Sequence, residues 1–210
     1  MKLLYPTYFP DAVTFSLLAK ASPIIWEVQG NYQKQTYRNR AFICNDRGKH
    51  MLSIPIAHLG KHNSKQRYKD VQIDNSYPWQ RQHWRTLETA YRTSPYFEFY
   101  EDDLNMLYTT TFTNLLDFNL KTIEIICACL QLDMPLNKTT LFQLNSIEHE
   151  DYRSLVSSKK NSTVEEEGYI QVFNDRHKFI SNLSILDLLF NLGPETITYL
   201  KKLHFTQNNA

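Results

Sequence analysis

The sequence predicts an α/β fold, a mixed sheet with a parallel βα start and a central hairpin, flanked by helices from the middle and the C-terminus. Three observations favour this fold. Two β-rich runs enclose a helical segment in the first thirty residues, two more flank a glycine-containing turn, and apolar residues recur at helical spacing in the middle and near the end of the chain.

The N-terminal part reads as strand, loop, helix and strand. A short apolar run at residues 2–4 precedes a loop that Pro6 and Pro10 keep extended, and Asp11 is placed to cap a helix over 12–21. Residues 23–29, PIIWEVQ, form the second strand. This order implies a parallel pair with the PTYFP loop at the carboxyl end of the first strand, where ligands of open α/β sheets bind.

The central hairpin is predicted from AFICND and MLSIPIA, which flank Arg47-Gly48-Lys49. Residues 71–74, VQID, have the composition of another strand. The polar, basic segment 58–70 between them has no periodicity, so it is predicted to be a loop.

Three helices are predicted in the middle of the chain. Pro78 opens the first, which carries Trp84, Leu87 and Tyr91 on one face, and a second follows Pro95. The third has the strongest periodic signal, an apolar stripe made of Phe112, Leu115, Leu116, Leu120, Ile123, Cys127 and Leu130.

The last third predicts two strands and two helices. Residues 138–147 and 169–173 have strand composition, and the polar segment 151–168 between them reads as a loop. The helices fall within 182–203, where Gly193 ends the first and Pro194 opens the second, with Ser184 or Asn182 as the cap. Asp187 is then a first-turn acid that faces its own helix dipole, a structural role.

Length and composition fit a single domain over residues 1–210, with a charged linker near 148–168 and a C-terminal helical segment over 181–204. The chain is 42% hydrophobic and 13% aromatic, which is enough apolar material for a core. Its three cysteines form no disulfide framework, and no signal peptide or run of the roughly 20 apolar residues of a membrane span is visible. These features predict a cytoplasmic protein.

The charge is unevenly distributed although the formal net charge is only +1. Residues 31–70 hold nine lysines and arginines against two aspartates. A local positive field of this size favours a small anionic ligand such as a phosphate or carboxylate, although a solvated basic face would look the same. Nucleic acid is disfavoured as a partner because the net charge is close to zero.

The segment YQKQTYRNR, residues 32–40, carries the best candidate ligand-binding residues. In an extended chain alternate side chains share a face, so Tyr32 and Lys34 lie together and Arg38 and Arg40 point together. Two guanidinium groups can grip a phosphate or carboxylate, and the Asn39 amide adds a hydrogen bond. The alternative is an exposed basic edge strand that discourages aggregation.

Five further residues are candidates for the same pocket. Tyr8 in the PTYFP loop and Gln29 would orient a substrate, and Trp79 lies one helical turn before His83. His83 is the candidate general acid or base because an imidazole titrates near neutrality, although a single histidine on an apolar helix face is more often a packing residue. Glu27, at the end of the second strand, is the other acid/base candidate.

Several kinds of site are not indicated. His58 and His62 have helical metal-pair spacing, but the glycine between them and the loop composition argue against a helix, so no metal site is expected. The chain has no P-loop, Gly-x-Gly-x-x-Gly, Gly-x-Ser-x-Gly or His-Glu-x-x-His motif. The sequence therefore names no cofactor, and it indicates no oligomeric state.

Several of these segments, in this order, resemble the WbqC-like family: PTYFP, the strand ending in VQ, YQKQTYRNR, the hairpin running into LSIPI, the W…H…Y…SPYF series, LLDFNLKTIE and the terminal LSILDLLFNLGPE. The resemblance covers nearly the whole chain. Many family members are longer between LNSI and the C-terminal motif, where this chain has a short charged linker.

The resemblance implies a bacterial protein with a role in surface polysaccharide biosynthesis, since the family is named from O-antigen gene clusters and its biochemistry is poorly defined. Together with the basic segment, it predicts a transferase acting on a small phosphorylated or nucleotide-linked substrate. The alternative is a non-catalytic module that binds an anionic sugar or a partner protein.

Overall fold

Strand β1 (Lys2–Leu4) is the middle strand of a three-stranded parallel sheet in the computed structural model, which describes residues 1–57, 66–157 and 163–206. Strand β2 (Ile24–Trp26) pairs with one edge of β1 and β5 (Glu150–Asp151) with the other. The predicted parallel βα start is confirmed. The outer edge of β2 is covered by residues 137–139, because Trp26 N–H donates to the Asn137 carbonyl over 2.8 Å.

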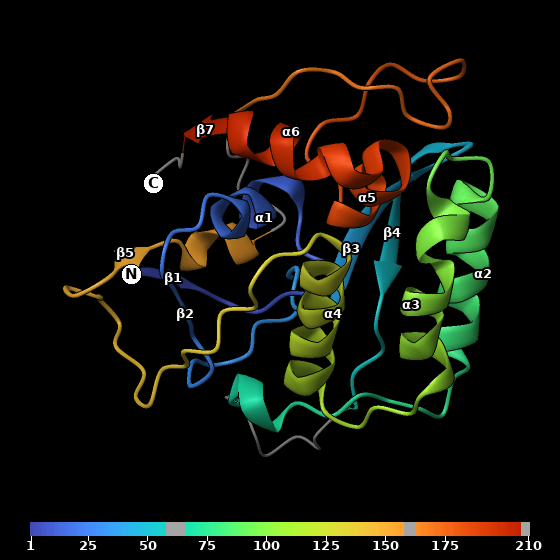
Figure 1. Ribbon diagram of the computed structural model, residues 1–210. Helices are drawn as coiled ribbons and strands as arrows, with labels where there is room; N and C mark the ends of the chain where they lie inside the picture. The colour runs from blue at the N-terminus through green and yellow to red at the C-terminus, as the bar shows by residue number, and fades with distance from the viewer. Residues whose placement is uncertain (58–65, 158–162, 207–210) are drawn as a thin grey trace.

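Helix α1 (Ala12–Ala19) connects β1 to β2 and begins where the sequence predicts. The Asp11 carboxylate caps it by accepting from Thr14 N–H over 2.9 Å. Every residue of α1 is buried, because the helix lies between the sheet and the C-terminal helices (Figure 1). A helix enclosed in this way is apolar all round rather than amphipathic.

The antiparallel hairpin of β3 (Arg40–Asn45) and β4 (Gly48–Ser53) is also confirmed. Gly48, at φ +102°, ends the tight turn in a conformation that other residues rarely adopt. Because β3 begins at Arg40, the preceding residues 32–39 are irregular rather than a strand.

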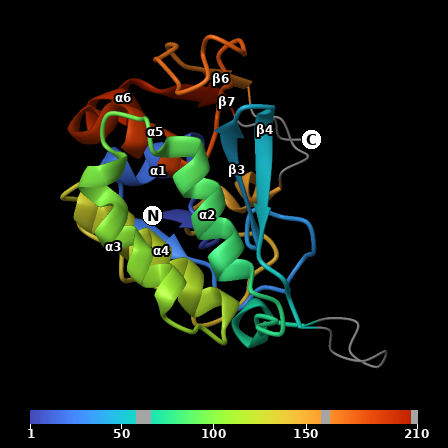
Figure 2. The same ribbon diagram turned by 90° about the vertical axis from the view of Figure 1, so that its right-hand side faces the viewer.

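Helices α2 (Trp79–Tyr91), α3 (Phe97–Thr109) and α4 (Leu115–Cys129) form as predicted. Figure 1 shows the sheet at one end of the molecule and α2 with α3 at the other, with the β3–β4 hairpin and α4 between them. Figure 2 shows the three helices from their outer side. The buried apolar residues form one core that runs from the sheet to these helices.

The C-terminal part consists of α5 (Ile185–Leu192), the 3₁₀ turn η3 (Gly193–Glu195), α6 (Thr196–Lys202) and β7 (His204–Thr206), which pairs antiparallel with β6 (Thr163–Glu165). Both predicted helices are confirmed. Ser184 is the cap of α5, whereas Asn182 binds across to the N-terminal segment by accepting from Val13 N–H and donating to Asp11.

Three strand predictions are wrong. Residues 138–147 form no strand and carry mostly exposed side chains, and residues 169–173 form no strand either. Residues 71–74 contribute only isolated bridges, with Ile73 opposite Ile56 and Gln72 opposite Asn114. In each case the β-rich composition is present, but within the described residues these segments make at most isolated bridges and no continuous ladder.

Two predicted irregular segments are described only in part. The loop predicted for 58–70 lies outside the described residues up to 65, together with His58 and His62, and then forms a 3₁₀ turn, η1 (Tyr68–Asp70). The charged segment near 148–168 contains β5, a 3₁₀ turn η2 (Arg153–Val156) and β6.

Candidate functional site

The three parallel strands deliver polar residues to one edge of the sheet. Tyr5 follows β1, Glu27 follows β2, and Arg153 opens η2 two residues after β5. The carboxyl ends of adjacent parallel strands meet at the same edge, which is where open α/β sheets bind ligands. This edge is the candidate site.

Arg38 is the most unusual residue near this edge. Its side chain is 1% exposed, and its guanidinium carbon lies 3.8 Å from the ring centroid of Tyr5 and 5.2 Å from that of Tyr68. Two of its donors, Nε and Nη1, have no hydrogen-bond partner within the described residues. Burial lowers the pKa of Arg38, and Tyr68 and Tyr5 oppose this shift. A buried guanidinium with open donors is a site where an anion would be stabilised.

The backbone around Arg38 is held from three directions. Asn119, on α4, donates from Nδ2 to the Arg38 carbonyl and to the Tyr68 hydroxyl, over 2.6 Å in each case. The Tyr68 hydroxyl donates to the Pro6 carbonyl over 2.7 Å. Tyr8 N–H donates to the Tyr37 carbonyl over 2.9 Å. The PTYFP loop, residues 32–40, η1 and α4 are thereby joined around one guanidinium.

Unpaired polar atoms gather at this point. Of the eight buried side-chain nitrogen and oxygen atoms that lack a partner within the described residues, six belong to Thr7, Arg38, Asn39, Arg40 and Asn119. Arg38 and Arg40 both lower the pKa of Tyr32, which burial raises to about 12, so Arg40 lies close to the same ring. We call Tyr5, Thr7, Tyr32, Arg38, Asn39, Arg40, Tyr68 and Asn119 the Arg38 cluster.

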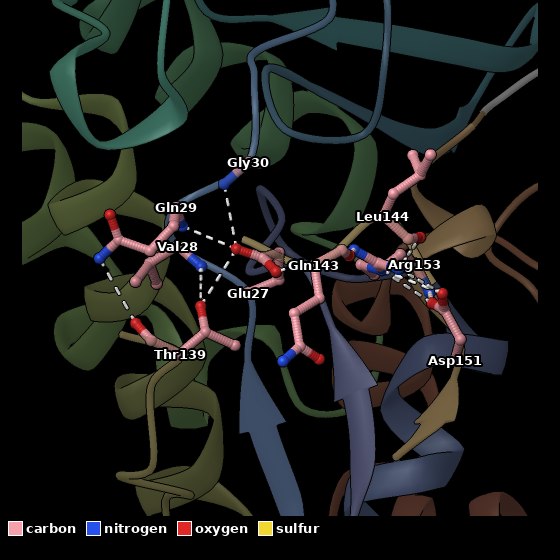
Figure 3. Close-up of polar contacts among 9 residues, drawn as sticks. All are labelled: Glu27, Val28, Gln29, Gly30, Thr139, Gln143, Leu144, Asp151 and Arg153. Carbon is pink, nitrogen blue, oxygen red and sulfur yellow. Dashed lines mark hydrogen bonds and ion pairs between the residues drawn. The ribbon is translucent and has the colours of Figure 1, made fainter. Parts of the chain in front are cut away.

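Glu27 is anchored to the turn after β2 (Figure 3). Its Oε1 accepts from Gln29 N–H at 2.7 Å, Gly30 N–H at 3.0 Å and the Thr139 hydroxyl at 3.1 Å. A Cβ on Gly30 would lie 2.4 Å from the Tyr5 hydroxyl oxygen, so the Tyr5 side chain depends on a glycine at this position. The Tyr5 ring thus contacts the Arg38 guanidinium, and its hydroxyl lies beside Gly30, whose N–H binds Glu27.

Arg153, which the sequence analysis did not single out, is bound on every side. It donates to the Asp151 carboxylate, to the Gln143 carbonyl over 2.7 Å and to the Leu144 carbonyl over 2.8 Å, and its Nη1 lies 3.8 Å from Glu27 Oε2 (Figure 3). Hydrogen bonding to Asp151 raises the pKa of Arg153. Arg153 thus fastens residues 143–144 to the sheet and closes one side of the candidate site.

Three of the sequence candidates form a separate group in the core. The Tyr8 hydroxyl lies 3.0 Å from His83 Nδ1 and 2.9 Å from the Tyr108 hydroxyl, and the Trp79 ring packs edge-on against His83. Burial lowers the pKa of His83 to about 4, so the imidazole is neutral at neutral pH. Tyr8, Trp79 and His83 are all buried. Tyr8 is linked to the Arg38 cluster through its backbone.

The remaining sequence candidates do not all lie in the candidate site. Tyr32, Arg38, Asn39 and Arg40 come together in the Arg38 cluster, and Gln29 lies beside Glu27 with its side-chain amide 3.4 Å from the Thr139 carbonyl. Lys34 is exposed on the bend at residues 34–36. The irregular path of residues 32–39 removes the alternation of side chains on which the grouping of Lys34 with Tyr32 depended.

Asp187 has a different role from the predicted one. Its side chain is fully buried and accepts from Tyr91 at 2.7 Å, Tyr169 at 2.5 Å and Gln171 at 3.0 Å, so it binds other segments rather than only its own helix dipole. Burial raises the pKa of Asp187, and the three donors oppose the shift. The carboxylate fastens residues 169–171 to α2 and α5, which is a structural role of another kind.

Two features are absent from the described residues. No helix in them is long and apolar enough to cross a membrane. The described ranges also hold no group of three or more histidine, cysteine, aspartate and glutamate side chains placed to bind a metal ion.

Comparison with known proteins gives two matches. The model of a family described as the WbqC-like protein family matches residues 5–163, a range that includes the whole Arg38 cluster. The uncharacterized protein Rv1507c of Mycobacterium tuberculosis is 26% identical over 225 aligned residues, which cover 95% of this chain and 96% of that protein. No solved structure matches this chain.

Proposed function

The chain belongs to the WbqC-like protein family, and we propose that it binds a small anionic metabolite, phosphorylated or nucleotide-linked, in the Arg38 cluster. The observation that carries this proposal is the pair of open donors on Arg38, a side chain that is 1% exposed. Nε and Nη1 face different sides of the guanidinium, so each can donate a charge-assisted hydrogen bond to a separate oxygen, one of them on a phosphate or carboxylate group.

The energetics favour an anion over an empty site. An unpaired buried charge destabilises a fold by several kcal/mol, and stacking on tyrosine rings offsets about 1–2 kcal/mol of this. A bound anion would neutralise the buried charge and satisfy an open donor in a region of low dielectric, where charge-assisted hydrogen bonds are strong. Tyr5 and Tyr32 are the half-buried aromatic members of the cluster, so the ligand would enter on their side.

A transferase is the second candidate function, favoured by the position of Glu27. This carboxylate is 1% exposed and binds the Gly30 backbone, beside which lies Tyr5, whose ring contacts Arg38; a group near the anion could accept or orient a proton of a bound hydroxyl. In surface polysaccharide biosynthesis the substrate would be a nucleotide-linked sugar. His83 would act indirectly, by positioning Tyr8.

The test is a thermal-shift screen with nucleotides, nucleotide sugars and phosphorylated metabolites. A ligand present at a hundred times its dissociation constant should stabilise the protein by about 2.7 kcal/mol. Arg38→Gln should abolish the shift, while the free variant is as stable as the wild type or more so because an unpaired buried charge is gone. Lys69→Gln, an exposed charge beside Tyr68, should leave the shift unchanged.

The outcomes separate the two candidates. A flat screen, or equal binding by wild type and Arg38→Gln, contradicts the proposed site. If Glu27→Gln retains binding but loses turnover of the bound compound, the transferase is supported. If the wild type and Glu27→Gln both bind the compound and neither converts it in the presence of sugar or amine acceptors, the protein is a non-catalytic binding module.

A further inference from the structure

The Arg38 cluster holds open acceptors as well as open donors. The oxygens Asn119 Oδ1, Asn39 Oδ1 and Thr7 Oγ1 are buried and have no hydrogen-bond partner within the described residues. An anion alone does not complete such a site, because its oxygens are themselves acceptors.

The identity of these amide oxygens is fixed by their surroundings. Asn119 Nδ2 faces the Arg38 carbonyl, which can only accept, so the other amide atom must be the oxygen. The Tyr68 hydroxyl that Nδ2 also meets gives its proton to the Pro6 carbonyl, which agrees with this orientation. Asn39 is fixed in the same way, because its Nδ2 donates to the Ile54 carbonyl over 3.2 Å. Both Oδ1 atoms are therefore true acceptors.

The open donors and acceptors lie on one short stretch of chain. Arg38 Nε and Nη1, Asn39 Oδ1 and Arg40 Nε are on consecutive residues, and Asn119 contacts the Arg38 backbone directly. Thr7 lies between Pro6, whose carbonyl binds Tyr68, and Tyr8, whose N–H binds Tyr37. The rings of Tyr5, Tyr32 and Tyr68 add flat apolar surface around these atoms.

We infer that the ligand of the Arg38 cluster carries hydroxyl or amino donors next to its anionic group, as in a sugar phosphate or sugar acid. This inference rests on the proposed function and specifies its substrate class. The anionic group would accept from one of the open guanidinium donors, and hydroxyl groups would donate to Thr7, Asn39 and Asn119. A bare anion would leave those buried acceptors unpaired, or filled by water, and would bind more weakly.

The test compares two pairs of six-membered-ring compounds with the same anionic group, of which one member carries hydroxyl groups and the other none. Calorimetric titration of the wild-type protein would use glucose 1-phosphate against cyclohexyl phosphate, and glucuronate against cyclohexanecarboxylate. Inorganic phosphate serves as the bare anion. The hydroxylated member of at least one pair should bind at least about tenfold more tightly, since an unpaired buried acceptor weakens binding by that order.

Two variants test whether the difference in affinity within a pair arises from contacts in the Arg38 cluster. Asn39→Ala should bring the affinity ratio of the pair towards one while the affinity for cyclohexyl phosphate stays the same. Thr7→Val, an isosteric change that removes a hydroxyl without a partner, should keep the fold and also lower the ratio. Lys69→Gln is the control and should leave the ratio unchanged.

The outcomes distinguish this inference from the proposed function. Equal affinity within both pairs overturns the inference, because the buried acceptors would then be paired with water and not with ligand hydroxyls. If Arg38→Gln also loses anion binding, the proposed function still stands. If no compound of either pair binds, nor inorganic phosphate, nor any compound of the nucleotide and metabolite screen, the site itself is refuted. A ratio that both Asn39→Ala and Thr7→Val leave intact places the hydroxyl contacts outside the cluster and also contradicts the inference.

Discussion

The buried polar residues of this protein differ in whether their hydrogen-bonding atoms are all paired. Arg153 and Asp187 are buried, and each has its hydrogen-bonding capacity met by named partners. Arg38 and Asn119 are equally buried but keep open atoms. Buried polar groups in native proteins are mostly paired, so the contrast separates structural anchors from ligand-binding candidates.

Gly30→Ala should destabilise the protein by about 1–3 kcal/mol, because the new Cβ would lie 2.4 Å from the Tyr5 hydroxyl oxygen. Adding Tyr5→Phe should recover part of the loss, since the nearest remaining atom is a ring carbon at 3.2 Å. Urea unfolding of the single and double variants measures the coupling. Gly168→Ala is the control, as its Cβ would meet no atom closer than 3.8 Å. Strict additivity of the two changes would contradict the contact.

Asp187→Asn should lower the free energy of unfolding by about 1–3 kcal/mol. The amide keeps the shape but turns one acceptor into a donor opposite Tyr91, Tyr169 and Gln171. Gln171 cannot rotate its amide to compensate, because its oxygen and nitrogen both bind the Ile180 backbone. Asp175→Asn, with a side chain 72% exposed, should change stability by less than about 0.5 kcal/mol. Equal stabilities for both variants would show that the Asp187 cluster is not structural.

At the scale of elements, short segments are held by contacts with remote ones. Helix α2 packs on the PTYFP loop through His83 and Tyr8, and α5 begins at a serine whose hydroxyl donates to the Phe9 carbonyl over 3.0 Å. Both contacts are buried, so a change in the protonation state of a group in one of them changes the stability of the fold.

The His83 imidazole should make stability depend on pH. Its pKa is lowered to about 4 in the folded protein, below the ordinary value of 6.5. As pH falls below 6.5 the unfolded chain takes up a proton that the folded protein refuses until about pH 4, so stability is present above this window and is lost on acidification. The loss is roughly 3 kcal/mol between these pH values. His83→Gln keeps a hydrogen-bonding group for Tyr8 but cannot titrate.

Urea unfolding at pH 7.5, 6 and 4.5 measures this effect as a difference between the two proteins, because other acidic groups titrate in both. The wild type should lose more stability than His83→Gln over this range. Parallel pH curves would mean that His83 is not desolvated as the structure describes.

Much of the fold follows from local patterns, and the candidate site follows only partly. Asp11 as a cap, the glycine turn of the hairpin and the apolar stripe of α4 act within a few residues, so periodicity predicts them. Arg38 and Arg40 were found because their charges are clustered in sequence. Asn119 is a polar residue in an apolar helix, but its bond to the Arg38 carbonyl spans 81 residues. Such a pairing leaves no trace in local spacing.

The strand predictions for 138–147 and 169–173 failed for the same reason. Strand composition describes what a segment can do, whereas a ladder requires a second segment at the right distance. Residues 137–139 do meet β2, but only through the Trp26 backbone before the chain leaves the sheet.

At the scale of the whole molecule, the N-terminal and C-terminal segments are joined. Ala12 N–H donates to the Leu183 carbonyl, Asn182 binds Asp11, and Ser184 N–H donates to the Phe42 carbonyl. The C-terminal helices cover α1, although the match to the family model ends at residue 163. These contacts favour one domain over residues 1–210.

Calorimetry should therefore show one unfolding transition, with calorimetric and van't Hoff enthalpies in agreement. Deletion of residues 181–210 should prevent folding, since it would expose the buried residues of α1 to water. Two separate transitions, or a folded product of this deletion, would contradict a single domain.

The position of β1 determines when the fold can be completed. Lys2 and Leu3 pair on one side with Ile24 and Ile25 and on the other with Glu150 and Asp151, so β1 receives its second neighbour only after roughly 150 further residues have been translated. Until then one edge of this strand has open N–H and C=O groups that an extended segment of another chain can occupy. Newly synthesised protein should consequently be more prone to association than the mature molecule.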